Sequence, residues 1–167
     1  MILFAYASNM NVGEFATHVT SARKLCNAYL PGYRFAFNKI GHDGSAKANV
    51  EPTDELDAKV WGVLIDISEE DRLHVFNPAD DWTEHLELLP LSCIGTDGET
   101  YTAQVFISKP HAVNDSLLPY DWYQEKLATF ALWQNLPVEY ISNLNTVQSK
   151  VDPDAKRRER RLSKYRR

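Results

Sequence analysis

The residues with the clearest chemical potential lie at the start of the chain, in the stretch MILFAYASNMN. An apolar run from Ile2 ends at Tyr6, and the small or polar residues Ala7, Ser8 and Asn9 follow it. Buried strands usually end in Gly, Pro or Asp turns, so this ending calls for another explanation. Each backbone amide is a hydrogen-bond donor. The stretch therefore predicts a loop of uncovered amide donors held at the end of a strand.

The sequence does not contain the other common motifs of catalysis and cofactor binding. Gly32, Gly41 and Gly44 fit neither GxGxxG nor the P-loop pattern, so no phosphate-binding glycine loop is expected. No GxSxG sequence surrounds a serine, and Ser8 lacks His and Asp partners at suggestive positions, so a serine nucleophile is not expected. The histidines form neither HxxxH nor HxH, which predicts no metal site. They are His18, His42, His74, His85 and His111.

Length and composition indicate one globular domain. The chain has 167 residues, of which 44% are hydrophobic and 25% are charged, which is ordinary for such a domain. The longest apolar run, 60–67, contains a Gly and an Asp, so no membrane span is expected. The N-terminus lacks the pattern of a signal peptide, and Cys26 and Cys93 form no disulfide framework. We expect a cytoplasmic protein with no membrane partner and with both cysteines buried as small hydrophobic residues.

Charge is distributed unevenly along the chain. The tail from Lys156 to Arg167 holds eight Lys or Arg and one Glu, a net charge of +7. The rest of the chain has ten basic and twenty-two acidic residues, a net charge of −12. Such a tail could bind nucleic acid or an acidic partner. It could equally be a helical or frayed terminus that lies against its own acidic domain.

The elements that must position these residues show two periodicities. Alternating or continuously apolar segments predict strands at residues 2–6, 33–38, 46–50, 59–67, 84–93 and 100–108. Helical signals are weak over 11–28, begin again after the N-cap residue Ser68, and are stronger over 120–134 and 138–147. Clustered strands followed by helices favour an α+β domain with a small barrel-like or strongly bent mixed sheet.

Five segments match a known pattern in order and spacing over about residues 2–147. They are FAYASNMN, GYRFAF, SAKANVEP, VWGVLIDISEED and LPVEYISNL. They resemble the FAYGSNM/L signature, the GYRLxF, GxAxIxP and VWGVLYxLxxxD elements and the GLPxxYIxxL ending of the γ-glutamylcyclotransferase family, also called AIG2-like proteins. The resemblance implies a γ-glutamylcyclotransferase-like domain over residues 1–150, with residues 151–167 as a basic C-terminal tail outside it.

The family resemblance implies a small twisted mixed β-barrel with surrounding helices and a cavity at its mouth. It also implies a reaction that needs no cofactor. The α-amine of a γ-glutamyl amine or amino acid attacks its own γ-amide carbonyl, which forms 5-oxoproline and expels the amine. Backbone amides of residues 7–10 would hold the anionic groups of this small-molecule substrate. The implied substrate-binding residues are Tyr6, Ala7, Ser8, Asn9, Met10 and Tyr123.

The reaction also needs a carboxylate to move a proton from the ammonium group to the leaving amine, and here the chain departs from the family. The family's LDxxEG motif is missing. Alignment without gaps puts Ala79 at the Glu position, whereas one inserted residue aligns 76–81 with the motif and puts Asp80 in the catalytic place. Asp81 and Glu84 are the alternatives. The acidic pair 80–81 could also be a solvated loop, which would leave an inactive protein that binds a small anion.

Three further positions bear on the site. Ala7 replaces the signature Gly, which costs on the order of 1 kcal/mol if its φ is positive and otherwise only narrows the anion site. Phe130 replaces a Gly of the late helix and is expected to fill or reshape the pocket floor. Tyr123 could be a pocket residue or a core tyrosine with a satisfied hydroxyl.

We therefore expect a cyclotransferase with Asp80 as the general base. The alternatives are an inactive protein that binds a small anion, and an interaction protein that acts through its basic tail. The sequence does not predict the leaving amine or the oligomeric state.

Overall fold

The computed structural model describes residues 1–77 and 81–165 of the chain. Within these residues, five strands form a closed barrel whose neighbours are antiparallel, except for one parallel pair. In barrel order they are β1 (Ile2–Ala5), β5 (Lys59–Asp66), β2 (Arg23–Pro31), β6 (Leu86–Gly95) and β7 (Thr100–Ser108). The parallel pair, Leu3 with Gln104, joins β1 to β7 and closes the barrel. This confirms the predicted α+β class and the small mixed barrel.

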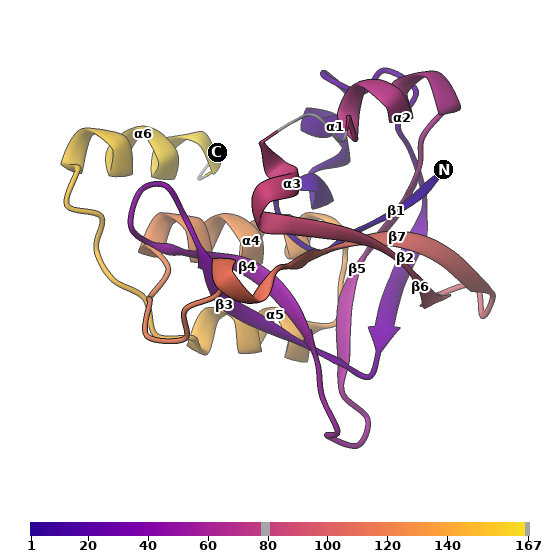
Figure 1. The fold of residues 1–167 in the computed structure, drawn as a ribbon. Helices are drawn as coiled ribbons and strands as arrows, with labels where there is room; N and C mark the ends of the chain where they lie inside the picture. The colour runs from indigo at the N-terminus through magenta and orange to yellow at the C-terminus, as the bar shows by residue number, and fades with distance from the viewer. Residues whose placement is uncertain (78–80, 166–167) are drawn as a thin grey trace.

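A hairpin and two groups of helices surround the barrel (Figure 1). The hairpin consists of β3 (Tyr33–Ile40) and β4 (Ala46–Pro52), which pair antiparallel. The short elements are η1 (Ser8–Met10), α1 (Val12–Phe15), α2 (Glu69–Val75), α3 (Trp82–His85) and η2 (Pro110–Ala112). The longer helix α4 (Asp121–Trp133) contacts both α5 (Val138–Thr146) and α6 (Ala155–Tyr165). None of the described helices is both long and apolar enough to cross a membrane.

β1 separates two parts of the core because its side chains alternate between the faces of the barrel wall. Phe4 belongs to one buried cluster, and Leu3 and Ala5 belong to the other. The neighbouring strand β5 approaches β1 closely at Gly62. A Cβ atom on this glycine would lie 2.5 Å from the Ala5 carbonyl oxygen. Glycine at this position therefore lets β1, which carries the amide loop, lie close against β5 in the barrel wall.

Residues 11–28 correct one prediction, because they are not a helix. A single helical turn ends at Phe15, and from Arg23 the chain forms β2. Ala28 and Leu30 are almost fully buried, which is the period-two pattern of a strand. β2 pairs with both β5 and β6, and this tertiary pairing outweighs a weak local helical preference. The strand predicted at 84–93 likewise begins later, at Leu86, after the helical turn of α3.

The basic tail forms the helix α6, which packs against α4 (Figure 1). Leu162 and Tyr165 of α6 are buried. The turn before α6 is fixed by Asp152, whose buried carboxylate accepts a hydrogen bond from Trp122 Nε1 at 2.7 Å and two from Arg157 at 2.6 Å. The tail thus lies against the acidic domain, as one of the two sequence interpretations expected. Nucleic-acid binding by the same residues stays a prediction.

Candidate active site

A cavity of about 270 Å³ lies at the end of β1, where the sequence predicts the amide loop. Five of the predicted substrate-binding residues line it, and so do residues from both strands of the hairpin and from the barrel wall. The predicted ones are Tyr6, Ala7, Ser8, Asn9 and Tyr123. The others that the argument below uses are Lys39, Lys47, Leu86 and Phe106. Segments up to about 120 residues apart in the sequence therefore meet around one cavity.

The amide loop is held in place from both of its ends. At its start, the Tyr6 hydroxyl donates a hydrogen bond to the Phe106 carbonyl oxygen at 2.6 Å. At its end, the Met10 amide donates to the Ala7 carbonyl at 2.9 Å. The first amides of a helical turn have no acceptor within the turn. The amides of Ser8 and Asn9 are therefore the donors that the loop can offer to an anion.

Met10, which the resemblance also placed in the binding site, supports the loop from beneath. Its side chain is fully buried in the core cluster of Leu3 and Ala5. Its carbonyl oxygen accepts a hydrogen bond from Gln134 Nε2 at 2.8 Å, which ties the loop to the end of α4. Ala7 has a φ of −129°, so the alanine methyl brings no left-handed backbone strain, and its effect is to narrow the site.

Both tyrosines of the cavity are buried and neutral. The Tyr123 hydroxyl accepts a hydrogen bond from the Ala48 amide at 3.3 Å and is also hydrogen-bonded to Ser8. Burial raises the pKa of Tyr123. Burial, and then the proximity of Tyr123 and Tyr140, raises the pKa of Tyr6. Neutral hydroxyls act as both donors and acceptors, which suits the recognition of polar groups on a ligand.

Two lysines in the cavity were not predicted from the sequence. Lys39 and Lys47 are paired in the register of β3 and β4, so both side chains reach the same region. Lys47 Nζ lies 2.7 Å from Asp43 and 4.8 Å from the centre of the Tyr123 ring. Burial first, and then the charge of Lys47, lowers the pKa of Lys39. The only signal in the sequence was a lysine placed between two buried alanines of a short strand.

The predicted general base lies outside the described residues, because Asp80 falls in the segment 78–80. Its alternatives are described, and neither lines the cavity. Asp81 is exposed at the start of α3, and the Glu84 side chain is 72% exposed. Among the described residues, no carboxylate lines the cavity. However, α3 continues directly into Leu86, which does line it, so the acidic segment is joined to the cavity wall.

Phe130 does not form the floor of this cavity, and that expectation was wrong. Its ring is completely buried and packs edge-on against Tyr165 of α6, with 5.1 Å between ring centres. It also contacts Trp133 on the same helix. The large side chain at this helix position therefore helps to dock α6, which sequence reasoning could not see because Tyr165 is thirty-five residues away.

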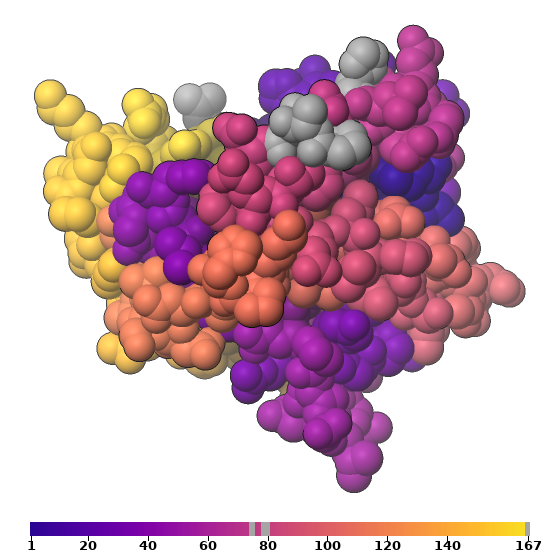
Figure 2. All heavy atoms as spheres, viewed as in Figure 1, coloured from indigo at the N-terminus to yellow at the C-terminus, as the bar shows by residue number. Residues whose placement is uncertain are grey.

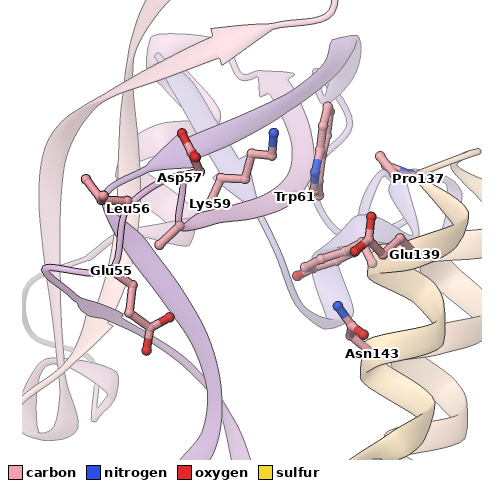
Figure 3. Close-up of a pocket in the computed structure, with 10 residues that line it drawn as sticks. Glu55, Leu56, Asp57, Lys59, Trp61, Pro137, Glu139 and Asn143 are labelled. Carbon is pink, nitrogen blue, oxygen red and sulfur yellow. The ribbon is translucent and has the colours of Figure 1, made fainter.

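A second cavity, of about 450 Å³, lies on another side of the barrel between β5, the loop before it and α5. Figure 3 shows Lys59 and Trp61 on the barrel side facing Glu139 and Asn143 on α5. No predicted site residue lines it. Within the described chain, no cluster of three or more His, Cys, Asp or Glu side chains could hold a metal ion.

Comparison with solved structures identifies the fold. The chain matches a γ-glutamyl cyclotransferase with a TM-score of 0.80 and 18% sequence identity, covering 98% of each chain. The chain has the γ-glutamyl cyclotransferase fold. An uncharacterised protein from Homo sapiens also matches, with a TM-score of 0.76, 18% identity and 97% of each chain covered. YkqA from Bacillus subtilis matches over 90% of this chain and 56% of its own, with a TM-score of 0.70 and 16% identity.

Comparisons by sequence found no counterpart, since no family model and no curated protein matches the chain. At the identities above, the γ-glutamyl cyclotransferase fold is established and the reaction is not. The chemistry of this chain depends on the side chains around its own cavity.

Proposed function

We propose that the protein is a γ-glutamylcyclotransferase-type enzyme that converts a small γ-glutamyl amine or amino acid into 5-oxoproline and the free amine. The observation that carries the proposal is the cavity at the end of β1, where amide donors, two neutral tyrosine hydroxyls and two lysines converge. Such a set of donors recognises the carboxylate and the amide of a γ-glutamyl group.

The proposed reaction needs positioning more than chemical assistance. The α-amine nitrogen forms a bond to the γ-carbonyl carbon, and the bond from that carbon to the leaving amine breaks. The ammonium proton leaves through the general base and ends on the leaving amine. In this proposal Lys39, Lys47 and the amides of Ser8 and Asn9 bind the α-carboxylate, and Asp80 is the base. The folded substrate brings its own nucleophile, which explains how a cavity of this size would suffice.

A specific observation favours a second candidate, a protein that binds a small γ-glutamyl-like anion without turning it over. The described lining of the cavity contains cations, amides and hydroxyls, but no carboxylate. A site of this composition would bind an anion whether or not a base is present. The two candidates differ only in what the segment 78–80 contributes.

The test is an assay of 5-oxoproline with a panel of γ-glutamyl amines, using the wild type, Asp80→Asn and the matched control Asp81→Asn. We expect Asp80→Asn to lower kcat by about 100-fold or more with little change in KM, because a proton-transfer group typically contributes 10²–10⁴-fold. Asp81→Asn should stay close to the wild type. Activity that survives Asp80→Asn would place the base elsewhere. Binding detected by calorimetry with no 5-oxoproline from any substrate would establish the second candidate.

A further inference from the structure

A cationic cavity adjoins the candidate active site, and the proposed reaction leaves it unused. It has a volume of about 280 Å³ and lies between the β3–β4 turn, α4 and α6. In Figure 2 the yellow surface of α6 borders the purple surface of this turn. Lys47 and Tyr123 line both this cavity and the first one. A ligand longer than the folded γ-glutamyl group could therefore extend from the first cavity into this one.

Cations outnumber carboxylates among the described residues that line this cationic cavity. Three cationic side chains line it, Lys47, Lys126 and Arg161, and one carboxylate, Asp43. Asp43 is already held by Lys47, with 2.7 Å between oxygen and nitrogen. Lys126 and Arg161 therefore contribute two positive charges, in a protein whose net charge is −5.

Arg161 is oriented as a binding residue would be. Its guanidinium lies over the Trp122 ring, 5.4 Å from the ring centre, which fixes the plane of the group. Its Nε atom is buried and has no hydrogen-bond partner among the described residues. A buried donor without an acceptor costs free energy, and the guanidinium that carries it also lines the cavity, where its other N–H groups can donate to an anion.

Lys126 adds a second donor from a different helix. Its ammonium group lies 5.4 Å from the centre of the Phe130 ring and 5.7 Å from that of Tyr165, both in the seam between α4 and α6. The nearby carboxylate Glu14 is paired with Lys164, 2.5 Å away. The two cations Lys126 and Arg161 match the charge of a phosphate monoester, which is about −1.5 to −2 at pH 7, better than that of a single carboxylate.

We propose that Lys126 and Arg161 form a subsite for a phosphate group carried by the amine half of the substrate. This inference rests on the proposed function for the position of the γ-glutamyl half in the first cavity. The substrate class is then a γ-glutamyl amide of a phosphorylated amine. The phosphate lies in the α4–α6 cavity, and the scissile amide lies near Lys47 and Tyr123, where the two cavities meet.

Three probes that differ only at the far end of the amine test the subsite. They are γ-glutamylethanolamine, its phosphate ester and γ-glutamyl-β-alanine, which are neutral, phosphorylated and carboxylated at that end. Dissociation constants are measured by calorimetry in an Asp80→Asn background, and 5-oxoproline formation is measured separately with Asp80 intact. We expect the phosphate ester to bind at least about tenfold more tightly than either of the other probes, since one charged hydrogen bond is worth about this factor.

Arg161→Gln and Lys126→Gln should each remove most of this advantage and leave the affinity for the neutral probe unchanged. The matched control is Arg160→Gln, which removes the same charge from the neighbouring, exposed position of α6. It should keep the preference for phosphate. Thermal melting of each variant shows whether α6 is still docked, and Lys126→Gln tests the subsite with the sequence of α6 unchanged.

Equal affinity for the phosphate and carboxylate probes would overturn the inference, as would a phosphate preference that survives both Arg161→Gln and Lys126→Gln. A failure of the proposed function can be distinguished from a failure of the subsite. A phosphate preference lost in these variants, without 5-oxoproline from any probe, would keep the subsite and reject the enzyme. Turnover of all three probes at the same kcat/KM, with equal affinities, would keep the enzyme and reject the subsite.

Discussion

Lys126 differs from a solvent-exposed lysine because of where its ammonium group lies. Burial lowers its pKa to about 8, Glu14 opposes this shift, and Arg161, Lys164 and Lys47 add to it. The group is therefore charged at neutral pH but loses its proton at a much lower pH than usual. A binding group of this kind makes affinity depend on pH in a range where solvent-exposed lysines do not titrate.

This property gives a prediction for the phosphate probe of the proposed subsite. Affinity should fall as pH rises through about 8, because Lys126 becomes neutral, and it should also fall below about pH 6, where phosphate loses its second charge. Calorimetry from pH 5 to pH 9.5 checks both limbs. In Lys126→Gln the loss of affinity above about pH 8 should disappear, and the loss of affinity below about pH 6 should remain. An unchanged alkaline limb in that variant would show that another group titrates.

At the level of elements, the position of the amide loop depends on how closely β1 lies against β5. Gly62 permits this approach, since an added Cβ would meet the Ala5 carbonyl oxygen and the ring of Phe4, at 2.5 and 2.9 Å. Backbone atoms cannot move aside as a flexible side chain can. The strand would have to shift, and the loop that begins one residue after Ala5 would shift with it.

We therefore predict that Gly62→Ala destabilises the protein by about 1–3 kcal/mol, the usual cost of overpacking. The same variant should weaken the binding of γ-glutamyl ligands, because the amides of residues 8 and 9 move. The control is Gly13→Ala in α1, where an added Cβ would meet its nearest atom at an ordinary 3.7 Å. Urea denaturation of both variants measures the difference. Equal stability of the two variants would contradict this account.

At the level of the whole molecule, α6 joins parts of the chain that are distant in sequence. Three ion pairs connect the segment 152–164 to itself, to α4 and to α1. They are Arg157–Asp152, Arg158–Asp121 and Lys164–Glu14. Hydrogen bonds from Arg157, and then the other donors around it, hold the pKa of Asp152 well below its usual range. The positive charge of the tail is thus partly compensated within the fold.

Asp152 should therefore stabilise the protein in a pH-dependent way. Because its folded-state pKa is lowered, its contribution is complete above the unfolded pKa of about 3.9 and is lost as pH falls below that value. We predict that Asp152→Asn is less stable than the wild type at pH 7 and that the difference shrinks towards pH 2.5. Urea denaturation at several pH values measures it, with the exposed Asp54→Asn as the control. A difference that does not vary with pH would contradict the role of the charge.

Much of the fold could be predicted from sequence because apolar and polar residues alternate within most of its strands. The strands around Tyr33, Val60 and Thr100 carry their own period-two pattern, and the hairpin turn at Gly98 carries its own turn residues. β2 was missed because its strand state depends on pairing with β5 and β6 rather than on its own residues.

The candidate site likewise has one part that the sequence predicts and one part that it does not. The amide loop is contiguous, so the sequence revealed it. The cations around it come from separate elements, with Lys39 and Lys47 on the hairpin, Lys126 on α4 and Arg161 on α6. No spacing rule connects them, because only the packing of α6 on α4 and the closing of the hairpin bring them together.

The parallel pair of β1 and β7 has a consequence for the synthesis of the chain. The contacts of Leu3 with Gln104 and of Tyr6 with Phe106 cannot form until about one hundred further residues have been translated. Translation proceeds at roughly 5–20 residues per second, so β7 is complete on the order of 5–20 s after β1 has been synthesised. Contacts this distant in sequence also slow the folding of small domains. We therefore expect the loop that follows the first strand to become ordered only after β7 has been synthesised.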